Sequence, residues 1–306
     1  MIKDLVSIIT PCYNGEKYLK KYFNSILEQT YPYIELIFIN DGSTDNTENI
    51  VDEYIPLLEK KGIKTTIISQ NNLGQAAALN KGLEIFEGEF LIWPDSDDQL
   101  TSNSIKEKVE FLKKNPGYDM VRSNGIYYNV TTRQKRKISN SENDFKEDIF
   151  EDLLLLKTYG CCGCYMIKSS LFKKIYPNKK IFESKYGQNW QILVPAASRT
   201  KCGYIDKELY IVTEHEDSHS RNSKISVFDR WDGFTEILEN CIEHSVCDKQ
   251  KMVKKVRRNN ARQQFYYAIE TQDKYIINQK FNKLKREGKV SLKEYMLYFK
   301  CYILKR

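Results

Sequence analysis

Long hydrophobic runs are missing from this chain of 306 residues. The first apolar segment, Leu5–Ile9, is too short for the hydrophobic region of a signal peptide. No segment approaches the ~18 apolar residues that a membrane-spanning helix needs. With 41% apolar and 29% charged residues, the composition is that of an ordinary soluble globular protein. We therefore expect the protein to be cytoplasmic.

A complete zinc or disulfide pattern is also missing. Cys161 and Cys164 have the CxxC spacing of zinc and redox sites, but no second CxxC or histidine pair completes a zinc site. The eight cysteines come without a secretion signal, so a disulfide framework is not expected. We interpret residues 160–167 as a turn entering a strand, with the cysteines in packing roles and metal or redox chemistry as the alternative.

Acidic residues are outnumbered, because 48 Lys and Arg face 41 Asp and Glu, which gives a net charge of +7. The excess lies late in the chain, in Lys251–Arg262 and Lys280–Arg306. These stretches have the pattern of helix faces, and no nucleic-acid-binding motif accompanies them. We expect no nucleic-acid partner. An anionic membrane surface or an anionic substrate fits the charge equally well.

Strand and helix patterns alternate over the first hundred residues, which predicts an α/β fold with a mostly parallel sheet and helices on both faces. The expected strands are Leu5–Thr10, Ile34–Ile39, Lys64–Ser69 and Glu89–Trp93, and the expected helices are Glu16–Gln29, Asp45–Leu58 and Gln75–Phe86. Later, we expect helices at Ser104–Lys114 and Ile149–Lys157, and strands at Tyr118–Arg122, Ile126–Thr131, Cys164–Lys168 and Glu208–Thr213. The pattern is helical from Val227 onward. We divide the chain into residues 1–98, 99–222 and a C-terminal helical region, 223–306.

Asp95 and Asp97 are the most informative residues, because they follow the apolar strand that ends at Trp93. Two carboxylates one residue apart at a strand end can share one hard cation, such as Mg²⁺ or Mn²⁺, which keeps places for phosphate oxygens. The loops after the other strands emerge at the same edge of a parallel sheet. Polar residues in these loops converge there, which predicts a site for a metal-bound diphosphate.

Four blocks of this half resemble family two glycosyltransferases. Residues 6–19 (VSIITPCYNGEKYL), 39–47 (INDGSTDNT), 72–82 (NLGQAAALNKG) and 95–98 (DSDD) keep the order and spacing of the family's blocks. The resemblance implies a GT-A fold, an inverting mechanism, Mn²⁺ or Mg²⁺ as cofactor, and a nucleotide-sugar donor, usually UDP-linked. Bacterial members build capsule and other cell-surface polysaccharides, which implies a saccharide or a lipid-linked molecule as acceptor.

The same resemblance implies roles for single residues. Asp41 is expected to accept a hydrogen bond from the uracil imide, and Pro11 and Tyr13 to frame the base. Asp97 is expected to bind the metal directly, and Asp95 to reach the ribose hydroxyls or the metal through water. The implied donor site also contains Asn14, Asn72, Gln75 and Ser96. For Asp41 and Gln75 the alternative is a helix-capping role, and for Tyr13 an ordinary surface position. Leu79 stands where members often have Arg, so one donor contact is missing.

The Glu-Asp pair that supplies the general base in many family members is missing as well. Many members place Glu-Asp about ninety residues after the metal motif, and this chain has Gln188-Asn189 there, followed by Trp190. An amide cannot take a proton from an acceptor hydroxyl. Gln188, Asn189 and Trp190 still suit acceptor recognition, so we assign Asn189 to the catalytic region and name Glu183 and Asp217 as candidate bases. The alternative is a catalytically inactive homologue that binds nucleotide sugars.

Two further features come late. His219 is our candidate for the histidine that closes on the metal and diphosphate, with His215 second, and Arg221 could pair with a phosphate oxygen. Residues 291–306 have the pattern of an amphipathic helix with Leu292, Tyr295, Met296, Phe299, Tyr302 and Ile303 on one face. That face either packs on the protein or makes a peripheral contact with the inner face of the membrane.

A nucleotidyltransferase is disfavoured, because residues 11–14 (PCYN) are not the Gly-rich basic loop that holds a triphosphate.

Overall fold

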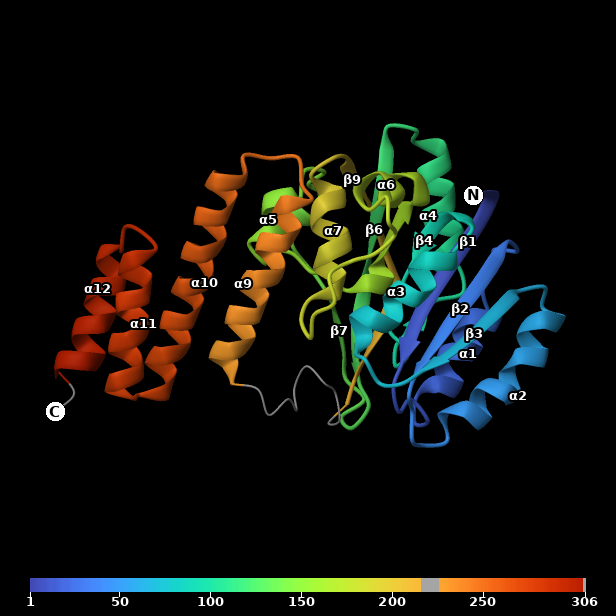
Figure 1. The fold of residues 1–306 in the computed structure, drawn as a ribbon, viewed down its shortest axis with the longest axis horizontal. Helices are drawn as coiled ribbons and strands as arrows, with labels where there is room; N and C mark the ends of the chain where they lie inside the picture. Colours follow the sequence, from blue (N-terminus) through green and yellow to red (C-terminus); the bar gives the residue numbers. More distant parts are fainter. Residues whose placement is uncertain (216–225, 305–306) are drawn as a thin grey trace. The chain divides into compact units, whose positions relative to one another are not determined.

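The computed structural model describes residues 1–215 and 226–304, and it divides into two compact units. The N-terminal unit is Met1–Asn222 and the C-terminal unit is Ser223–Arg306 (Figure 1). The predicted functions of residues 1–98 and 99–222 remain predictions. None of the helices in the described part of the chain combines the length and hydropathy needed to cross a bilayer.

One sheet runs through the N-terminal unit with the strand order β3-β2-β1-β4-β8-β6-β9-β5. Its first half is parallel and consists of β3 (Lys64–Gln70), β2 (Ile34–Asp41), β1 (Ile2–Cys12) and β4 (Gly88–Ile92). Its second half is mixed and contains β8 (Tyr165–Lys168), β6 (Tyr118–Asn129), β9 (Lys201–Glu214) and β5 (Gln99–Leu100), with β7 (Lys135–Lys137) paired to β6. Every residue of β2 is buried, as its continuous apolar run predicts for a central strand.

The expected helices follow the parallel strands. They are α1 (Leu19–Leu27), α2 (Thr47–Lys60) and α3 (Gln75–Ile85), and α3 packs on β1 and β2. The parallel register places Cys12 opposite Asn40 and Asp41 opposite Gln70. The strand ends are therefore level, and the loops that follow them meet at one edge of the sheet.

Three elements differ from their sequence-based predictions. Residues 118–131 were expected to form two strands, but β6 is one strand that continues through Gly125 with shifts in its register to β9. A side chain at Gly125 would collide with the backbone of Tyr210, so this glycine allows close strand approach instead of a turn. Helix α5 covers only Phe150–Leu154, because Leu156 adopts a positive φ of 56°. Strand β9 begins at Lys201, before the expected Glu208.

A buried lysine supports the turn that enters β8. Lys108, on α4 (Ser104–Lys114), donates hydrogen bonds to Ser104 Oγ and to the carbonyl of Gly163, each over 2.8 Å. Burial lowers the pKa of Lys108 to about 8. Gly163 lies in the 3₁₀ turn Cys162–Cys164. The lysine thus fixes a turn whose first residue, Cys162, reaches the acidic loop after β4.

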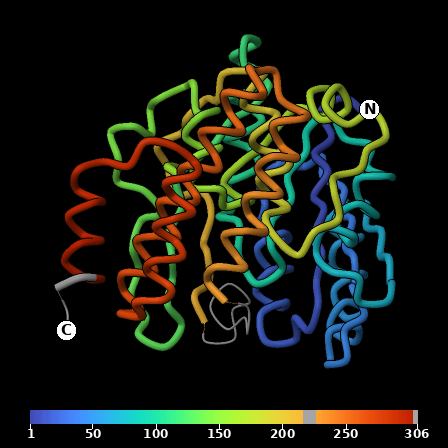
Figure 2. Tube along the Cα trace, turned by 60° about the vertical axis from the view of Figure 1, so that its left-hand side comes forward, coloured from blue at the N-terminus to red at the C-terminus, as the bar shows by residue number. Residues whose placement is uncertain are grey.

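The C-terminal unit consists of helices that alternate in direction (Figures 1 and 2). They are α9 (Val227–Glu243), α10 (Lys249–Thr271), α11 (Lys274–Arg286) and α12 (Leu292–Tyr298), which continues as a π-helical turn, Phe299–Leu304. Ser226, Asp248, Asp273 and Ser291 cap their starts through side-chain oxygens. The core of this unit contains Ala261, Phe265, Ala268, Ile277, Phe281, Leu284 and Val290.

Gly163 is expected to be sensitive to substitution. A Cβ at this position would overlap the ring of Tyr210, which is fully buried. We expect Gly163→Ala to lower the free energy of unfolding by about 1–3 kcal/mol, because overpacking forces the ring to move. Gly117→Ala is the matched control, since its Cβ would point into open space, and its effect should stay within about 0.5 kcal/mol. Urea denaturation of both variants checks this, and equal stabilities would contradict it.

Candidate active site

The acidic loop after β4 is held by residues from distant parts of the chain. Asp95 Oδ1 accepts a hydrogen bond from Gln75 Nε2 over 2.7 Å, and its Oδ2 accepts one from Cys162 Sγ over 3.2 Å. The backbone N–H of Asp95 donates to the hydroxyl of Tyr210 over 3.2 Å. Asp98 is buried, and its Oδ1 accepts from the backbone N–H of Thr213 over 2.8 Å. Both carboxylates are thus fixed by groups from α3, the Cys162–Cys164 turn and β9.

Burial and neighbouring negative charge raise the pKa values of Asp95 and Asp98 in this loop. Burial, and then the negative charge of Asp97, raise the pKa of Asp95 to about 6. Burial, followed by the charges of Asp97 and Asp95, raises the pKa of Asp98 as well. The carboxylates are therefore close enough to repel. A cation shared between Asp95 and Asp97 would relieve that repulsion.

Asp97 is the accessible carboxylate of the loop, and a histidine contacts it. His215 Nε2 lies 3.1 Å from Asp97 Oδ2, where the Asp97 side chain is 37% exposed. The imidazole is buried and stacks on the ring of Tyr18, with centroids 4.1 Å apart. Its Nδ1 is buried and has no hydrogen-bond partner among the residues that the structure describes. The sequence suggested His219 ahead of His215, and His219 lies outside the described residues. It is His215 that the geometry brings to Asp97.

The expected donor residues lie along the edge formed by β1, β2 and β3. Asp41 accepts hydrogen bonds from Gln70 Nε2 over 2.7 Å and from the N–H groups of Leu73 and Gly74 over 2.9 Å. This carboxylate therefore shapes the loop that contains Asn72 and leads into α3. Asn14, with a positive φ of 52°, ties the β1 loop to the β2 loop through Thr44 N–H, which donates to Asn14 Oδ1 over 2.8 Å.

The remaining donor residues have distinct surroundings. Pro11 lies within β1 opposite Ile39, and Tyr13 just beyond the strand is 38% exposed. Ser96 hydrogen-bonds the thiol of Cys12, which connects the acidic loop to the end of β1. The side-chain amide of Gln75 donates a hydrogen bond to Asp95 and so positions that carboxylate. Contact of these residues with a donor stays a prediction.

The expected acceptor residues begin α7 (Gln188–Ala197). Asn189 Oδ1 accepts a hydrogen bond from the indole N–H of Trp93 over 3.1 Å, which places this amide beside the end of β4. Trp190 covers Gly160, where any side chain would overlap the indole ring. Gln191 binds the backbone of Phe182 through both ends of its amide, over 2.8 and 2.9 Å. The start of α7 thus lies next to the acidic loop.

Only one of the two candidate bases can be placed. Glu183 is exposed and accepts a hydrogen bond from Asn80 Nδ2 over 3.3 Å. Asn80 also clamps the backbone of Ile181, so α3 fixes the position of this segment. Asp217, together with His219 and Arg221, lies outside the described residues.

Sequence reasoning missed three contributors to this site: Tyr18, Cys162 and Tyr210. Each is an ordinary core residue type, and only the contacts described above reveal their positions around the acidic loop. The cysteines in the described structure are free thiols, and burial raises the pKa of Cys161 to about 12 and raises the pKa values of Cys162 and Cys164. Protonated, buried thiols support the packing interpretation of the CxxC spacing.

The donor atoms of this site suit a hard divalent cation. Within the described residues no group of three or more His, Cys, Asp and Glu side chains could hold a metal ion by itself. Mg²⁺ and Mn²⁺ sites often use one or two carboxylates and complete their shell with water and substrate phosphates. Asp97, with Asp95 behind it, offers that number of ligands. His215 Nε2, 3.1 Å from Asp97 Oδ2, adds a nitrogen atom beside that carboxylate.

Known proteins resemble this chain over most of its length. The sequence model for glycosyl transferase family 2 matches residues 7–176. A glycosyltransferase of Rickettsia typhi with uncharacterised function is 30% identical over 250 residues, which cover 76% of this chain and 72% of that protein. TuaG of Bacillus subtilis, named for teichuronic acid biosynthesis, is 33% identical over 129 residues, which cover 40% of this chain and 50% of TuaG.

Solved structures show the same fold. Residues 1–349 of Staphylococcus aureus TarS, in complex with UDP-GlcNAc, align with a TM-score of 0.62 and 20% identity over 97% of this chain and 79% of that one. The mannosyltransferase PcManGT of Pyrobaculum calidifontis, in complex with GDP-Man and Mn²⁺, aligns with a TM-score of 0.57 and 14% identity over 98% of this chain and 79% of that one. The fold is thus the expected GT-A fold, and the chain belongs to glycosyl transferase family 2.

Proposed function

We propose that this glycosyltransferase moves a sugar from a UDP-linked donor to a saccharide or lipid-linked acceptor, with inversion and with help from a divalent cation. The observation that carries the proposal is the pair Asp95 and Asp97 at the end of β4, with His215 against Asp97. The nucleotide sugar of the TarS complex and the Mn²⁺ of the PcManGT complex support it. The name of TuaG supports a role in cell-surface polysaccharide synthesis.

The donor would bind along the edge formed by β1, β2 and β3. Pro11 and Tyr13 would frame the base, and the Asp41 carboxylate retains acceptor capacity for the uracil imide beyond the hydrogen bonds that it already makes. The loop that Asp41 shapes would present Asn72 to the nucleotide. Gln75 holds Asp95 Oδ1, so Asp95 would face the ribose or the cation in a fixed orientation.

Asp97 would hold the cation, and Asp95 would support it directly or through water. The cation, when bound, neutralises negative charge that develops on the departing diphosphate. His215 would orient Asp97 through its Nε2 contact, and its stacking on Tyr18 would keep the imidazole in place. Inversion requires only one displacement, in which the acceptor oxygen bonds to the sugar carbon as the bond from that carbon to the UDP oxygen breaks.

The acceptor hydroxyl must lose its proton during that displacement, and Asn189 cannot take it. Asn189, next to Trp93, would orient the acceptor sugar, and Gln188 and Trp190 would supply a further hydrogen bond and an apolar surface. The proton would pass to a carboxylate, with Glu183 and Asp217 as candidates. The Gln188-Asn189 pair also favours a second possibility, a homologue that binds the donor without transfer, and release of UDP from donor sugars would exclude it.

Asp97 should control metal-dependent binding of UDP. In wild-type protein, Mn²⁺ with UDP should raise the melting temperature, because ligand binds only the folded state. Asp97→Asn should remove most of that shift, whereas Asp52→Asn, which changes an exposed carboxylate on α2, should keep it. Differential scanning fluorimetry with and without Mn²⁺ measures both. An unchanged shift in Asp97→Asn would refute the role of Asp97.

The ionised carboxylate of Asp95 should lower the free energy of unfolding at neutral pH when no metal is present. Its pKa of about 6 lies above the ordinary 3.8, so the folded protein binds this proton more tightly than the unfolded chain does. Stability from this group is therefore gained as pH falls from about 6 to about 4, and lost above that range. Asp95→Asn should raise the free energy of unfolding by about 2 kcal/mol at pH 7.5. The gain should disappear near pH 4, as urea denaturation in EDTA would show. A less stable variant at pH 7.5 would contradict it.

The general base can be identified by comparing kcat values. Loss of a general base slows turnover by ~100-fold or more, so either Glu183→Gln or Asp217→Asn should show such a loss. Asn189→Ala is the matched comparison, and it should weaken acceptor use while leaving hydrolysis of the donor largely unchanged. Initial rates with varied acceptor concentration separate these effects. If both carboxylate variants keep kcat within a few-fold of wild type, neither residue is the base.

A further inference from the structure

Helix α12 has an apolar surface on two sides. On the inner side, Leu297 and Tyr298 pack against the core of the C-terminal unit, and Cys301 and Tyr302 of the π-helical turn join them. On the outer side, four apolar side chains are exposed. These residues, called the outer stripe here, are Leu292, Tyr295, Met296 and Phe299, with exposed fractions of 78%, 48%, 64% and 51%. Tyr295 borders the inner side, because the edge of its ring also contacts Phe281 of the core. Their spacing of three and four residues is that of one helix face.

The outer stripe cannot turn inward, because the opposite side of α12 is fixed by specific contacts. Ser291 and Glu294 form a capping box at its start, and the fully buried Glu294 pairs with Arg262 of α10. Tyr298 stacks on Phe281 with ring centroids 4.0 Å apart, and its hydroxyl donates to Asn278 Oδ1 over 2.8 Å. Tyr302, which the sequence placed on the same apolar face as Leu292 and Phe299, packs inward with this group.

Positive charge surrounds the outer stripe. Glu294 is the only carboxylate between residues 291 and 304, and it is buried, whereas Lys293 and Lys300 are exposed next to the stripe. The C-terminal unit has 19 Lys and Arg against 10 Asp and Glu, a net charge of +9. The N-terminal unit has 29 against 31, a net charge of −2. The whole excess of the chain therefore belongs to the unit that carries the outer stripe.

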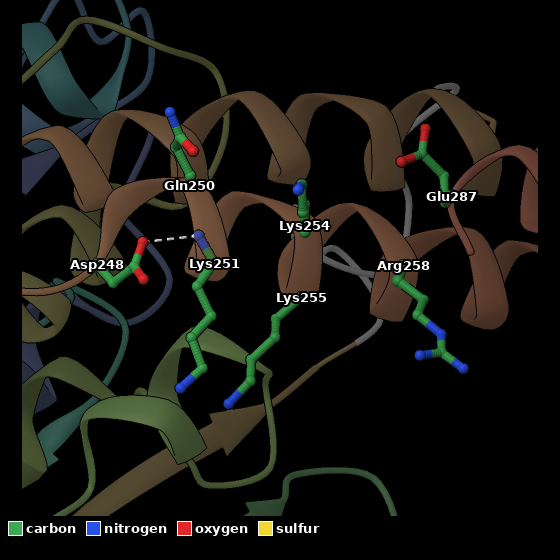
Figure 3. Close-up of a pocket in the computed structure, with 7 residues that line it drawn as sticks. All are labelled: Asp248, Gln250, Lys251, Lys254, Lys255, Arg258 and Glu287. Carbon is green, nitrogen blue, oxygen red and sulfur yellow. Dashed lines mark hydrogen bonds between the residues drawn. The ribbon is translucent and has the colours of Figure 1, made fainter. Parts of the chain in front are cut away.

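A cation-lined cavity adjoins the turn that leads into α12. The cavity has a volume of about 560 Å³ and is lined by Lys251, Lys254, Lys255 and Arg258, together with Asp248, Gln250 and Glu287 (Figure 3). The four cations project from successive turns of α10. Arg258 donates a hydrogen bond to the carbonyl of Lys289, two residues before the start of the α12 cap. This turn therefore joins the basic surface of α10 to the beginning of the outer stripe.

We propose that the C-terminal unit docks on an anionic lipid bilayer through the outer stripe. The apolar side chains would enter the boundary between headgroups and acyl chains, as in amphipathic helices that lie in a membrane surface. Lys293 and Lys300 would lie at the level of anionic headgroups, and the cations of α10 would add long-range attraction. A second copy of this chain fits less well, because two outer stripes would bring two units of +9 together. The proposal does not depend on the reaction that the N-terminal unit performs.

The experiment is co-sedimentation of the full-length chain with vesicles. We expect binding to vesicles that contain phosphatidylglycerol, little binding to pure phosphatidylcholine, and release as salt rises, because salt screens the attraction. Leu292→Asn/Met296→Asn/Phe299→Asn should abolish binding. The control Tyr33→Asn/Leu57→Asn/Ile85→Asn, which changes exposed apolar residues of the N-terminal unit, should bind normally. Lys293→Gln/Lys300→Gln should weaken binding about 30-fold, and Lys60→Gln/Lys61→Gln, with the same loss of charge, should not.

Several outcomes would overturn the proposal. Equal vesicle binding by the outer-stripe variant and its control would overturn it. Binding that changes neither with the charge of the lipid nor with the salt concentration would also overturn it. Sedimentation velocity addresses self-association, and a dimer that dissociates in the outer-stripe variant would assign the stripe to a second copy instead. The melting temperature of each variant is compared with that of the wild-type protein, so that loss of vesicle binding can be distinguished from unfolding.

Discussion

Repulsion among the carboxylates at the end of β4 is the constraint on which the site depends. Asp95, Asp97 and Asp98 lie within four residues, and Asp95 and Asp98 are kept away from bulk water. Such a turn is unfavourable unless other groups compensate for the charge. Its partners come from α3, from the Cys162–Cys164 turn and from β9, and His215 follows β9 directly. The mixed second half of the sheet thus serves to hold an acidic turn that the parallel half presents.

The sequence predicted the parallel half well, because its local signals agree with its tertiary structure. Apolar runs such as β2 are buried throughout, and the helices between them begin at polar turns. The second half was harder, because its boundaries depend on contacts between distant residues. Gly125 lies between the two strands expected at 118–122 and 126–131, yet it permits close approach to Tyr210 within one continuous strand. No local pattern distinguishes these two uses of glycine.

The candidate site divides in the same way. Asp41, Gln75, Asp95 and Asp97 could be named from the sequence because motifs mark them. Tyr18, Cys162 and Tyr210 could not, because Tyr18 acts by stacking on His215 and the other two by hydrogen-bonding Asp95. The structure places His215 against Asp97, whereas His219, the first candidate from the sequence, lies outside the described residues and stays a prediction. Similarly, the sequence assigned one apolar face to the last helix, but its inner face is set by the aromatic stack on Phe281, which leaves the outer stripe exposed.

The scattered origin of the contacts around Asp95 has a consequence for synthesis. During translation, the parallel strands and the loops that follow them leave the ribosome first, together with the acidic turn. Cys162, Tyr210 and His215 emerge only after a further sixty to one hundred and twenty residues, at roughly 5–20 residues per second. For several seconds the nascent chain therefore carries its acidic turn without the groups that stabilise it. The acidic turn is thus made early in translation, and it receives its last partners among the final events in the synthesis of the N-terminal unit.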